Sequence, residues 1–400
     1  MINLSNIKQA NSQLKNIIHK TPLIYSYSLS ELSGSKVYLK LENLQRTGSF
    51  KIRGAYNKLS KIRGKPKEVI AASAGNHAQG VALASKLLGI NATLVMPEGT
   101  PINKVMAVKN YGGKVLLHGN NFNESFKFAK QIEAKSNIPF IHPFDDPHVI
   151  AGQGTIGVEI LNSLKDLDAV IVPVGGGGLI SGISTVLKET NPEIRVVGVQ
   201  SNKAQSMLRS IKSKKIVEHS PSRSIAEGIN IKRVGNLTFQ IAQKYVDDII
   251  TVSDDEIEES LLLLTQRRRI VVEGAGAVGV AALLKQNKLF SNLNTAIVIS
   301  GGNIDINILS KIIERGLMKS GRLIRLEIEL PDIPGSLGKL TSILGNSKAN
   351  VVEIYHDRFS KKLPIDKAIV EIKLETRGHG HQKEIINNLK KNGYKPEICR

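Results

Sequence analysis

Residues 169–179 read Ala-Val-Ile-Val-Pro-Val-Gly-Gly-Gly-Gly-Leu, and this stretch decides the fold. It begins with a short run of mostly β-branched apolar residues, which is typical of a strand covered on both faces. The glycines then lead directly into Leu179–Glu189, whose apolar residues have helical spacing. A strand that passes through a small-residue turn into a helix is the repeating unit of a parallel sheet. We therefore expect an α/β fold.

Similar units recur from about Lys36 to Leu309, where short apolar runs alternate with helical patterns. The expected strands are Val37–Leu41, Glu68–Ser73, Thr93–Pro97, Lys114–His118, Ala169–Val174, Arg195–Gln200 and Thr295–Ser300. The clearest expected helices are Asn76–Leu88, Asn123–Lys135, Leu179–Glu189 and Asp254–Arg267. Because parallel strands end at the same edge of a sheet, the turns after them predict a ligand-binding crevice there.

The pattern changes after Ser320, so we expect domains at 1–319 and 322–400. The second begins with Arg322–Leu330, which alternates apolar and charged residues as a half-exposed antiparallel strand does. A Pro-Gly turn and a helix to about Asn346 follow. The rest is predicted to form strands Ala349–Asp357 and Ile365–Glu375, a helix from about Gly380 to Lys391 and a short strand at Lys395–Ile398. This order is βαββαβ, an α+β arrangement.

Composition excludes several classes of protein. The net charge is +20, but the lysines are scattered, the one tight basic run is Arg267–Arg269, and aromatic residues make up 4% of the chain. We expect no nucleic-acid partner, because such a site needs a basic stripe with stacking rings. No apolar stretch is long enough for a membrane span. The one cysteine, Cys399, indicates a reducing, cytoplasmic compartment. His379 and His381 lack further metal ligands and are interpreted as a loop.

Lys51 is the candidate catalytic residue, in the stretch Thr-Gly-Ser-Phe-Lys-Ile-Arg-Gly-Ala at 47–55. A lysine amine can hold an aldehyde cofactor as a Schiff base, although an isolated loop lysine is usually a surface residue. Three small-residue turns accompany it, at 73–77 (Ser-Ala-Gly-Asn-His), 175–179 (Gly-Gly-Gly-Gly-Leu) and 300–303 (Ser-Gly-Gly-Asn). Turns at helix starts suit anions because their N–H groups converge. The alternative for the glycine run is a flexible linker, which its apolar neighbours disfavour.

These four pieces resemble the pyridoxal-phosphate (PLP) enzymes of the tryptophan synthase β fold type, and most closely the threonine dehydratases. The resemblance covers nearly the whole chain and implies a two-lobed PLP domain. Further segments that match the pattern are Thr21–Leu23, Lys40–Gln45, Gly152–Thr155, Glu227–Gly228 and Glu273–Ala277.

The resemblance implies a role for each site residue. Lys51 and Ser300 are the catalytic residues, with Lys51 bonded to PLP and Ser300 facing its pyridine nitrogen. Expected cofactor contacts are Phe50, Lys51, Asn76, Gly175, Gly176, Gly177, Gly178, Leu179 and Ser300. Expected substrate contacts, mainly to the α-carboxylate, are Ser73, Gly75, Asn76 and His77. The alternatives are that His77 only starts a helix and that Ser300 only caps a turn.

Differences between this sequence and related enzymes reduce the number of reactions that fit it. Serine racemases have a second serine where this chain has Ala74, so racemisation is disfavoured. Related enzymes often carry acidic cation ligands where this chain has Gln200 and Ser206, so we expect no metal. The resemblance implies elimination of water from L-threonine to give 2-oxobutyrate and ammonia, and of L-serine to give pyruvate. The alternatives are a serine or hydroxyaspartate dehydratase or racemase, and a non-catalytic amino-acid sensor.

The C-terminal segment resembles an ACT domain through Asp332-x-Pro-Gly-x-Leu, Ala349–Val351 and His356–Arg358. Such domains bind amino acids where paired copies meet, so the resemblance implies a homodimer or homotetramer. The expected effector contacts are Gly335, Leu337 and Asn350. The expected effector is a branched-chain amino acid such as isoleucine, the end product of the pathway that 2-oxobutyrate enters.

Overall fold

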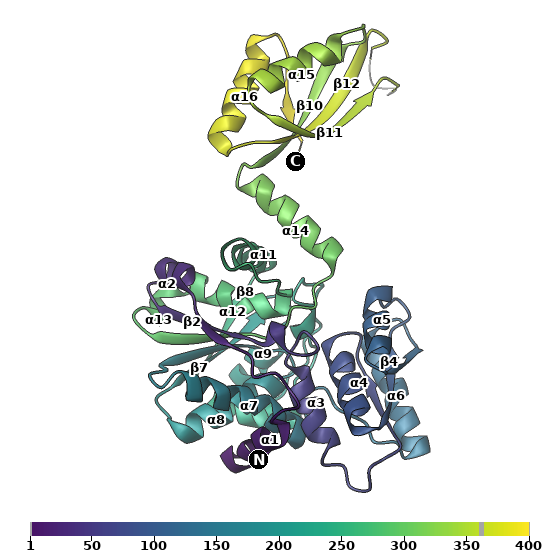
Figure 1. Cartoon of the computed structure of the whole chain (residues 1–400), viewed down its shortest axis with the longest axis vertical. Coiled ribbons are helices and arrows are strands. Elements are labelled where there is room, and N and C mark those ends of the chain that lie inside the picture. Colours follow the sequence, from purple (N-terminus) through teal and green to yellow (C-terminus); the bar gives the residue numbers. More distant parts are fainter. Residues whose placement is uncertain (1, 360–363, 400) are drawn as a thin grey trace. The chain divides into compact units, whose positions relative to one another are not determined.

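The structure is a computed structural model that describes residues 2–359 and 364–399. It divides into two compact units, Met1–Ile304 and Asp305–Arg400 (Figure 1). The division precedes helix α14 (Ile306–Lys319), whereas the sequence placed the boundary after this helix. Helix α14 packs on strand β10 (Leu323–Pro331), and this contact accounts for its grouping with the second unit.

A six-stranded sheet forms the centre of the first unit, in the order β1-β2-β9-β6-β7-β8. Its strands are β1 (Leu23–Tyr25), β2 (Lys36–Leu41), β9 (Asn294–Ile299), β6 (Ala169–Pro173), β7 (Arg195–Ser201) and β8 (Asp248–Val252). Only β1 runs antiparallel to its neighbour, and the other pairs are parallel. Neither β1 nor β8 was among the expected strands: β1 has only three residues, and β8 was missed although its Ile-Ile-Thr-Val run is typical of a strand.

Helices cover both faces of this sheet, which explains why its central strands β6 and β9 are largely apolar. Val170 and Val172 of β6 pack with α7 (Pro147–Ser163) and α8 (Gly178–Thr190). Ile171 points to the other face, where a side chain on Gly279 of α12 (Gly274–Lys285) would meet it. Figure 1 shows α12 on one side of the sheet and α7 and α8 on the other. Parallel strands require this double cover.

A smaller parallel sheet, β3-β4-β5, forms the other lobe of the first unit. Its strands are β3 (Glu68–Ala72), β4 (Asn91–Met96) and β5 (Lys114–Leu117). Its helices are α3 (Lys51–Leu59), α4 (Asn76–Leu88), α5 (Ile102–Asn110) and α6 (Phe122–Ser136). One apolar core joins α3 and α4 to the sheet, and another joins α6 to its opposite face. The expected two-lobed α/β fold is confirmed.

The remaining elements of the first unit are short. They are α1 (Leu4–Leu14), α2 (Tyr27–Ser33), η1 (Glu42–Leu44), α9 (Ser206–Lys212), η2 (Glu227–Ile229), α10 (Asn236–Tyr245), α11 (Asp254–Leu263) and α13 (Asn287–Phe290). Helix α11 is shorter than predicted, because the chain passes into a π-helical turn at Leu264–Arg268 that ends at Arg269 with a φ of 56°. No helix in the described part of the chain is long and apolar enough to cross a bilayer.

The second unit has an antiparallel four-stranded sheet in the order β11-β12-β10-β13. After β10 come α15 (Ser336–Asn346), β11 (Asn350–Asp357), β12 (Lys367–Glu375), α16 (His379–Lys391) and β13 (Glu397–Ile398). The βαββαβ order matches the prediction. The interpretation of His379 and His381 as a loop was wrong, since both lie in the first turn of α16. His381 is buried and hydrogen-bonds the Ser347 carbonyl through Nε2 at 2.7 Å, so it helps to hold this helix in place.

Candidate active site

Lys51 is the first residue of α3, and the loop before it lies against the turn after β9. Ser49 forms an isolated antiparallel bridge with Gly301. The Phe50 N–H donates to the Ser300 carbonyl at 3.2 Å. Ser300 is buried beside this bridge. The structure therefore brings together the two predicted catalytic residues, which lie far apart in the sequence.

The Lys51 amine is desolvated and has few partners. Its Nζ donates to the Pro143 carbonyl at 3.1 Å and lies 5.1 Å from the centre of the Phe50 ring. Burial lowers the pKa of Lys51 to about 8, and the charge of Glu273 opposes this only in part. Desolvation disfavours the charged form of an amine. A lysine with this pKa is a competent nucleophile near neutral pH.

The glycine run forms a turn between β6 and α8 that leaves no room for side chains. Gly177 has a φ of 98°, in the region that favours glycine. A Cβ on Gly176 would lie 2.3 Å from the Phe144 ring. Phe144 follows Pro143, whose carbonyl accepts from Lys51, so the turn and the lysine meet at this dipeptide. Leu179, the second residue of α8, is buried.

The turn after β3 places its residues differently. The Gly75 N–H donates to Ser73 Oγ at 3.2 Å, and a Cβ on Gly75 would meet nothing within 4 Å, so this turn borders open space. His77 is buried, with Nε2 2.9 Å from the Ile141 carbonyl. Burial lowers the pKa of His77 to about 3, so its ring is neutral. This hydrogen bond gives His77 a structural task, and its substrate contact stays a prediction.

Asn76 begins α4, and its side-chain amide has two partners that the sequence did not reveal. Its Nδ2 donates to both Glu273 carboxylate oxygens, at 2.8 and 3.0 Å. Its Oδ1 accepts from Asn303 Nδ2 at 2.7 Å. Burial raises the pKa of Glu273 above its usual range, which the Asn76 hydrogen bond partly opposes. The Glu-Gly-Ala-Gly-Ala and Ser-Gly-Gly-Asn motifs contain both partners, but spacing in the sequence could not pair them with Asn76.

The donors and the shape of this site fit PLP. The glycine turn has converging N–H groups at the start of a helix, which suit a phosphate. The Lys51 amine suits an aldehyde, and the buried Ser300 hydroxyl suits a ring nitrogen. A Cβ on Gly176 or Gly177 would fill space that is already tight against Phe144 and Thr238. The residues that would hold the cofactor therefore come from the carboxyl ends of strands in both lobes.

Gln200 and Ser206, where related enzymes often carry acidic ligands, are both buried. The Gln200 amide donates to the Val174 carbonyl at 3.3 Å and accepts from the Leu208 N–H at 2.9 Å. Its two ends are therefore engaged by the backbone. Among residues 2–359 and 364–399, no group of three or more His, Cys, Asp or Glu side chains has an arrangement suited to a metal.

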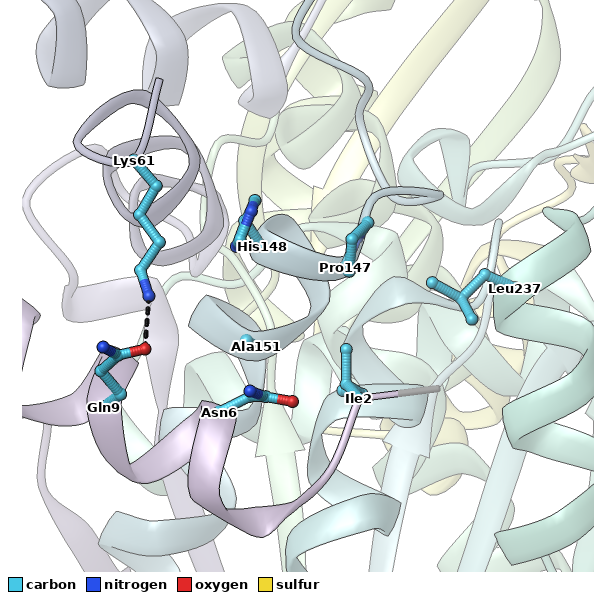
Figure 2. Close-up of a pocket in the computed structure, with 8 residues that line it drawn as sticks. All are labelled: Ile2, Asn6, Gln9, Lys61, Pro147, His148, Ala151 and Leu237. Carbon is cyan, nitrogen blue, oxygen red and sulfur yellow. Dashed lines mark hydrogen bonds between the residues drawn. The ribbon is translucent and has the colours of Figure 1, made fainter. Parts of the chain in front are cut away.

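A surface pocket of about 350 Å³ lies elsewhere in the first unit (Figure 2). It is lined by Ile2, Asn6, Gln9, Lys61, Pro147, His148, Ala151 and Leu237. Lys61 donates to Gln9 across it at 2.7 Å. None of these residues belongs to the predicted site, so the pocket is separate from the chemistry.

Comparisons with known proteins agree with the geometry. Residues 14–301 match the family model described as pyridoxal-phosphate dependent enzyme. The L-threonine ammonia-lyase of Thermotoga maritima is 48% identical over 401 residues, with 100% of both chains covered. The processed form of threonine deaminase isoform 2 from Solanum lycopersicum has a TM-score of 0.75 and 39% identity, covering 78% of this chain and 86% of that one. Maize serine racemase has a TM-score of 0.74 and 33% identity, covering 79% and 98%.

The family match spans the lysine, the first two turns and the first two residues of the third, and the full-length relative also includes the C-terminal unit. The cofactor of this family is the one that the donors around Lys51 fit. This chain therefore belongs to the pyridoxal-phosphate-dependent enzymes.

Proposed function

We propose that this chain is a threonine ammonia-lyase that converts L-threonine to 2-oxobutyrate and ammonia, and L-serine to pyruvate. The observation that carries the proposal is the desolvated Lys51 amine, which lies between the glycine turn and the Ser300 turn. The full-length similarity to a threonine ammonia-lyase supports the same substrate class. A sensor without chemistry has no need for a lysine in this state.

In this proposal Lys51 acts twice. Its Nζ would hold the cofactor in the resting enzyme, and when a substrate amine occupies that position the same atom would take the Cα proton. PLP, when bound, would withdraw electrons from the amino acid and so acidify that proton. The low pKa of Lys51 keeps a share of the amine neutral and able to accept the proton. The β-hydroxyl gains one proton and leaves as water, which balances the proton removed from Cα, and the enamine product then takes up water and releases ammonia to give the ketoacid.

The other residues orient the reactants. The N–H groups of Gly175–Gly178 would hold the phosphate, and Asn76 Nδ2 would donate to the phenolic oxygen. Ser300 presents a neutral hydroxyl to the ring nitrogen, and a hydroxyl stabilises a protonated ring less than a carboxylate does. This favours prompt elimination over slower side reactions. Ser73 and the N–H groups at the start of α4 bind the substrate carboxylate.

The test is a ketoacid assay of the purified holoenzyme with threonine, serine and hydroxyaspartate. Threonine should give 2-oxobutyrate with the highest kcat/KM. A preference for hydroxyaspartate would replace this proposal with the related dehydratase activity. No ketoacid from any of the three would leave only a binding function.

Elimination rather than racemisation is expected because Ala74 has no hydroxyl to protonate the opposite face of Cα. The similarity to maize serine racemase makes this test necessary. Incubation with L-serine should give pyruvate with little D-serine. Abundant D-serine would show that another group supplies the proton.

For the C-terminal unit we propose an ACT regulatory domain that binds isoleucine or valine and works as paired copies in a homodimer or homotetramer. The element order and the turn at Gly335 support this. Gly335 has a φ of 86° and precedes α15, and N–H groups in the first turn of a helix suit a carboxylate. Leu337 packs on the core of the unit, and Asn350 donates to Glu375 at 2.9 Å.

Calorimetry with isoleucine and valine on the full-length protein tests this domain. A coupling of ~1–3 kcal/mol would shift the apparent threonine affinity by roughly 5- to 150-fold. A chain truncated at Ser320 should lose the response. If neither amino acid binds, or the truncated enzyme keeps its full response, the effector proposal is wrong.

A further inference from the structure

The side chain of Asn303 has an orientation that a backbone carbonyl dictates. Its Nδ2 lies 2.8 Å from the Thr47 carbonyl oxygen, which can only accept a hydrogen bond. If the amide were turned over, Oδ1 would face that oxygen and two acceptors would repel each other. The Thr47 carbonyl therefore determines which end of Asn303 faces the site.

The orientation of the Asn303 amide in turn sets the orientation of the Asn76 amide. The second N–H of Asn303 Nδ2 points to Asn76 at 2.7 Å, so the atom that Asn76 presents there must be the acceptor Oδ1. Its Nδ2 then faces Glu273, whose oxygens lie at 2.8 and 3.0 Å. Thr47, Asn303, Asn76 and Glu273 thus form one chain in which each donor meets an acceptor.

Gly48 explains why this chain is tightly held. A Cβ at Gly48 would lie 2.4 Å from Asn303 Oδ1, so the absence of a side chain leaves the space that Asn303 fills. The Gly302 N–H also donates to the Gly48 carbonyl at 2.8 Å. The glycine before Lys51 and the asparagine after Ser300 are therefore complementary parts of one contact.

We propose that Asn303 is a positioning residue that sets the rotation of the Asn76 amide, so that Asn76 presents N–H groups and not its oxygen to the cofactor's phenolic oxygen. Asn76 Nδ2 carries two N–H groups, and one directed between the Glu273 oxygens leaves the other for the cofactor. The inference rests on the proposed function in one respect, since the contact of Asn76 with PLP belongs to that proposal.

The test uses N303D holoenzyme, because aspartate keeps the size of asparagine but presents an oxygen where Nδ2 was. Asn76 should then rotate, directing Oδ1 toward Glu273 and the cofactor. The fraction of bound PLP with an ionised phenolic oxygen, measured by absorbance, should fall. The kcat for threonine should fall ~10- to 100-fold with KM changed less than ~3-fold, since a hydrogen bond to a charged group is lost.

A matched control is N43D. Asn43 also donates to a backbone carbonyl, that of Val271 at 3.1 Å, and its Cβ lies 3.1 Å from the position of a Cβ on Gly302. The N43D variant introduces the same carboxylate beside the same turn but does not alter a hydrogen-bond partner of Asn76. Its absorbance should match the parent.

The N303A variant separates positioning from simple packing. Alanine removes one of the two groups that set the rotation of the Asn76 amide and leaves only Glu273. The spectrum of N303A should therefore shift toward the neutral phenol, but less than that of N303D. If Asn303 were merely structural, alanine would do more damage because it removes more contacts. An equal or larger shift in N303A than in N303D, or a parental spectrum in N303D, overturns the proposal.

Two further outcomes remain decisive. If thermal unfolding shows that N303D is not folded, the absorbance spectrum of N303A becomes the test. A shift toward the neutral phenol in N303A supports the positioning role of Asn303, and a parental spectrum contradicts it. If the parent binds PLP but forms no ketoacid from threonine, the proposed function fails. The absorbance comparison requires no turnover and still tests Asn303.

Discussion

Lys40 and Lys51 lie in the same unit and are both removed from water, yet their surroundings are opposite. Lys40 is buried against the Glu159 carboxylate and also donates to the Thr21 carbonyl at 2.6 Å. Lys51 meets one neutral carbonyl and no carboxylate at hydrogen-bond distance. Burial lowers the pKa of both amines. Lys40 has two acceptors, one of them charged, whereas Lys51 has one neutral acceptor. The partners of the amine, and not its burial, therefore distinguish the candidate catalytic lysine from the structural one.

The surroundings of Lys40 form a buried charge cluster made of Lys40, Glu42, Arg53 and Glu159. Arg53, two residues after Lys51, is fully buried and its five N–H donors each have an acceptor. These acceptors are the two carboxylates and the Thr155 hydroxyl. The Arg53 guanidinium lowers the pKa of Glu42 despite its burial. The cluster therefore anchors α3, the helix that begins at Lys51.

The largest expected effect comes from removing the free amine. Lys51→Ala should lower turnover more than ~1000-fold, because the cofactor anchor and the base are lost together. Borohydride should attach PLP to the Lys51 peptide of the parent, and mass spectrometry should find none on the Lys40 peptide. Near-normal turnover in the variant, or labelling at Lys40, would show that Lys51 is not the cofactor-binding lysine.

Removing Arg53, whose N–H donors all have acceptors, should instead lower the stability of the folded protein. Arg53→Met leaves the buried Glu42 without its ion-pair partner and Glu159 with Lys40 alone, and breaking a buried ion pair costs about 3–5 kcal/mol. Urea unfolding should show a correspondingly lower midpoint. Lys232→Met, which breaks an exposed pair with Glu218, is the control and should leave the midpoint unchanged. An Arg53→Met protein with parental stability would show that the cluster does not anchor α3.

The lowered pKa of Lys51 predicts how the apoenzyme recovers its cofactor. Below about 8 the amine is protonated and unreactive, so the rate of PLP attachment should rise ~10-fold per pH unit and level off above about 8. The pKa of Lys51 in the folded protein lies below the usual lysine value of 10.5, so this group disfavours folding when protonated. Stability of the apoenzyme should therefore rise with pH between about 8 and 10.5. A rate that still climbs tenfold per unit above pH 9 would show an ordinary lysine.

The smallest effect is expected from Gly48→Ala. Gly48 and Gly34 share a φ of 68°, but a Cβ at Gly34 would meet nothing closer than Ser291 Oγ at 3.7 Å. Gly34→Ala should thus cost only the backbone strain, ~1–2 kcal/mol, with activity kept. Gly48→Ala should cost more and lower activity, because its Cβ displaces Asn303. Equal stability losses and equal activities in the two variants would remove the link between Gly48 and the site.

Local patterns predicted most of the elements. The helix at Asn76–Leu88 has the predicted bounds, and the strand before the four glycines ends within one residue of its prediction. Such segments are predictable because a strand covered on both faces and a glycine turn are selected by nearby residues. Strand β8 was missed although its Ile-Ile-Thr-Val run is typical of a strand, and the π-helical end of α11 was missed because a π-helical turn departs from the α-helical period.

The sequence by itself determined the α/β class, the order of the elements, the reactive lysine and the turns that suit its cofactor. These depend on residue type and on neighbours in the chain. The tertiary structure decided that Glu273 and Asn303 hold Asn76, that Arg53 satisfies two carboxylates, and that β9 lies between β2 and β6. The physical reason is that a hydrogen bond depends on direction and distance between groups far apart in the chain, and only packing brings those groups together.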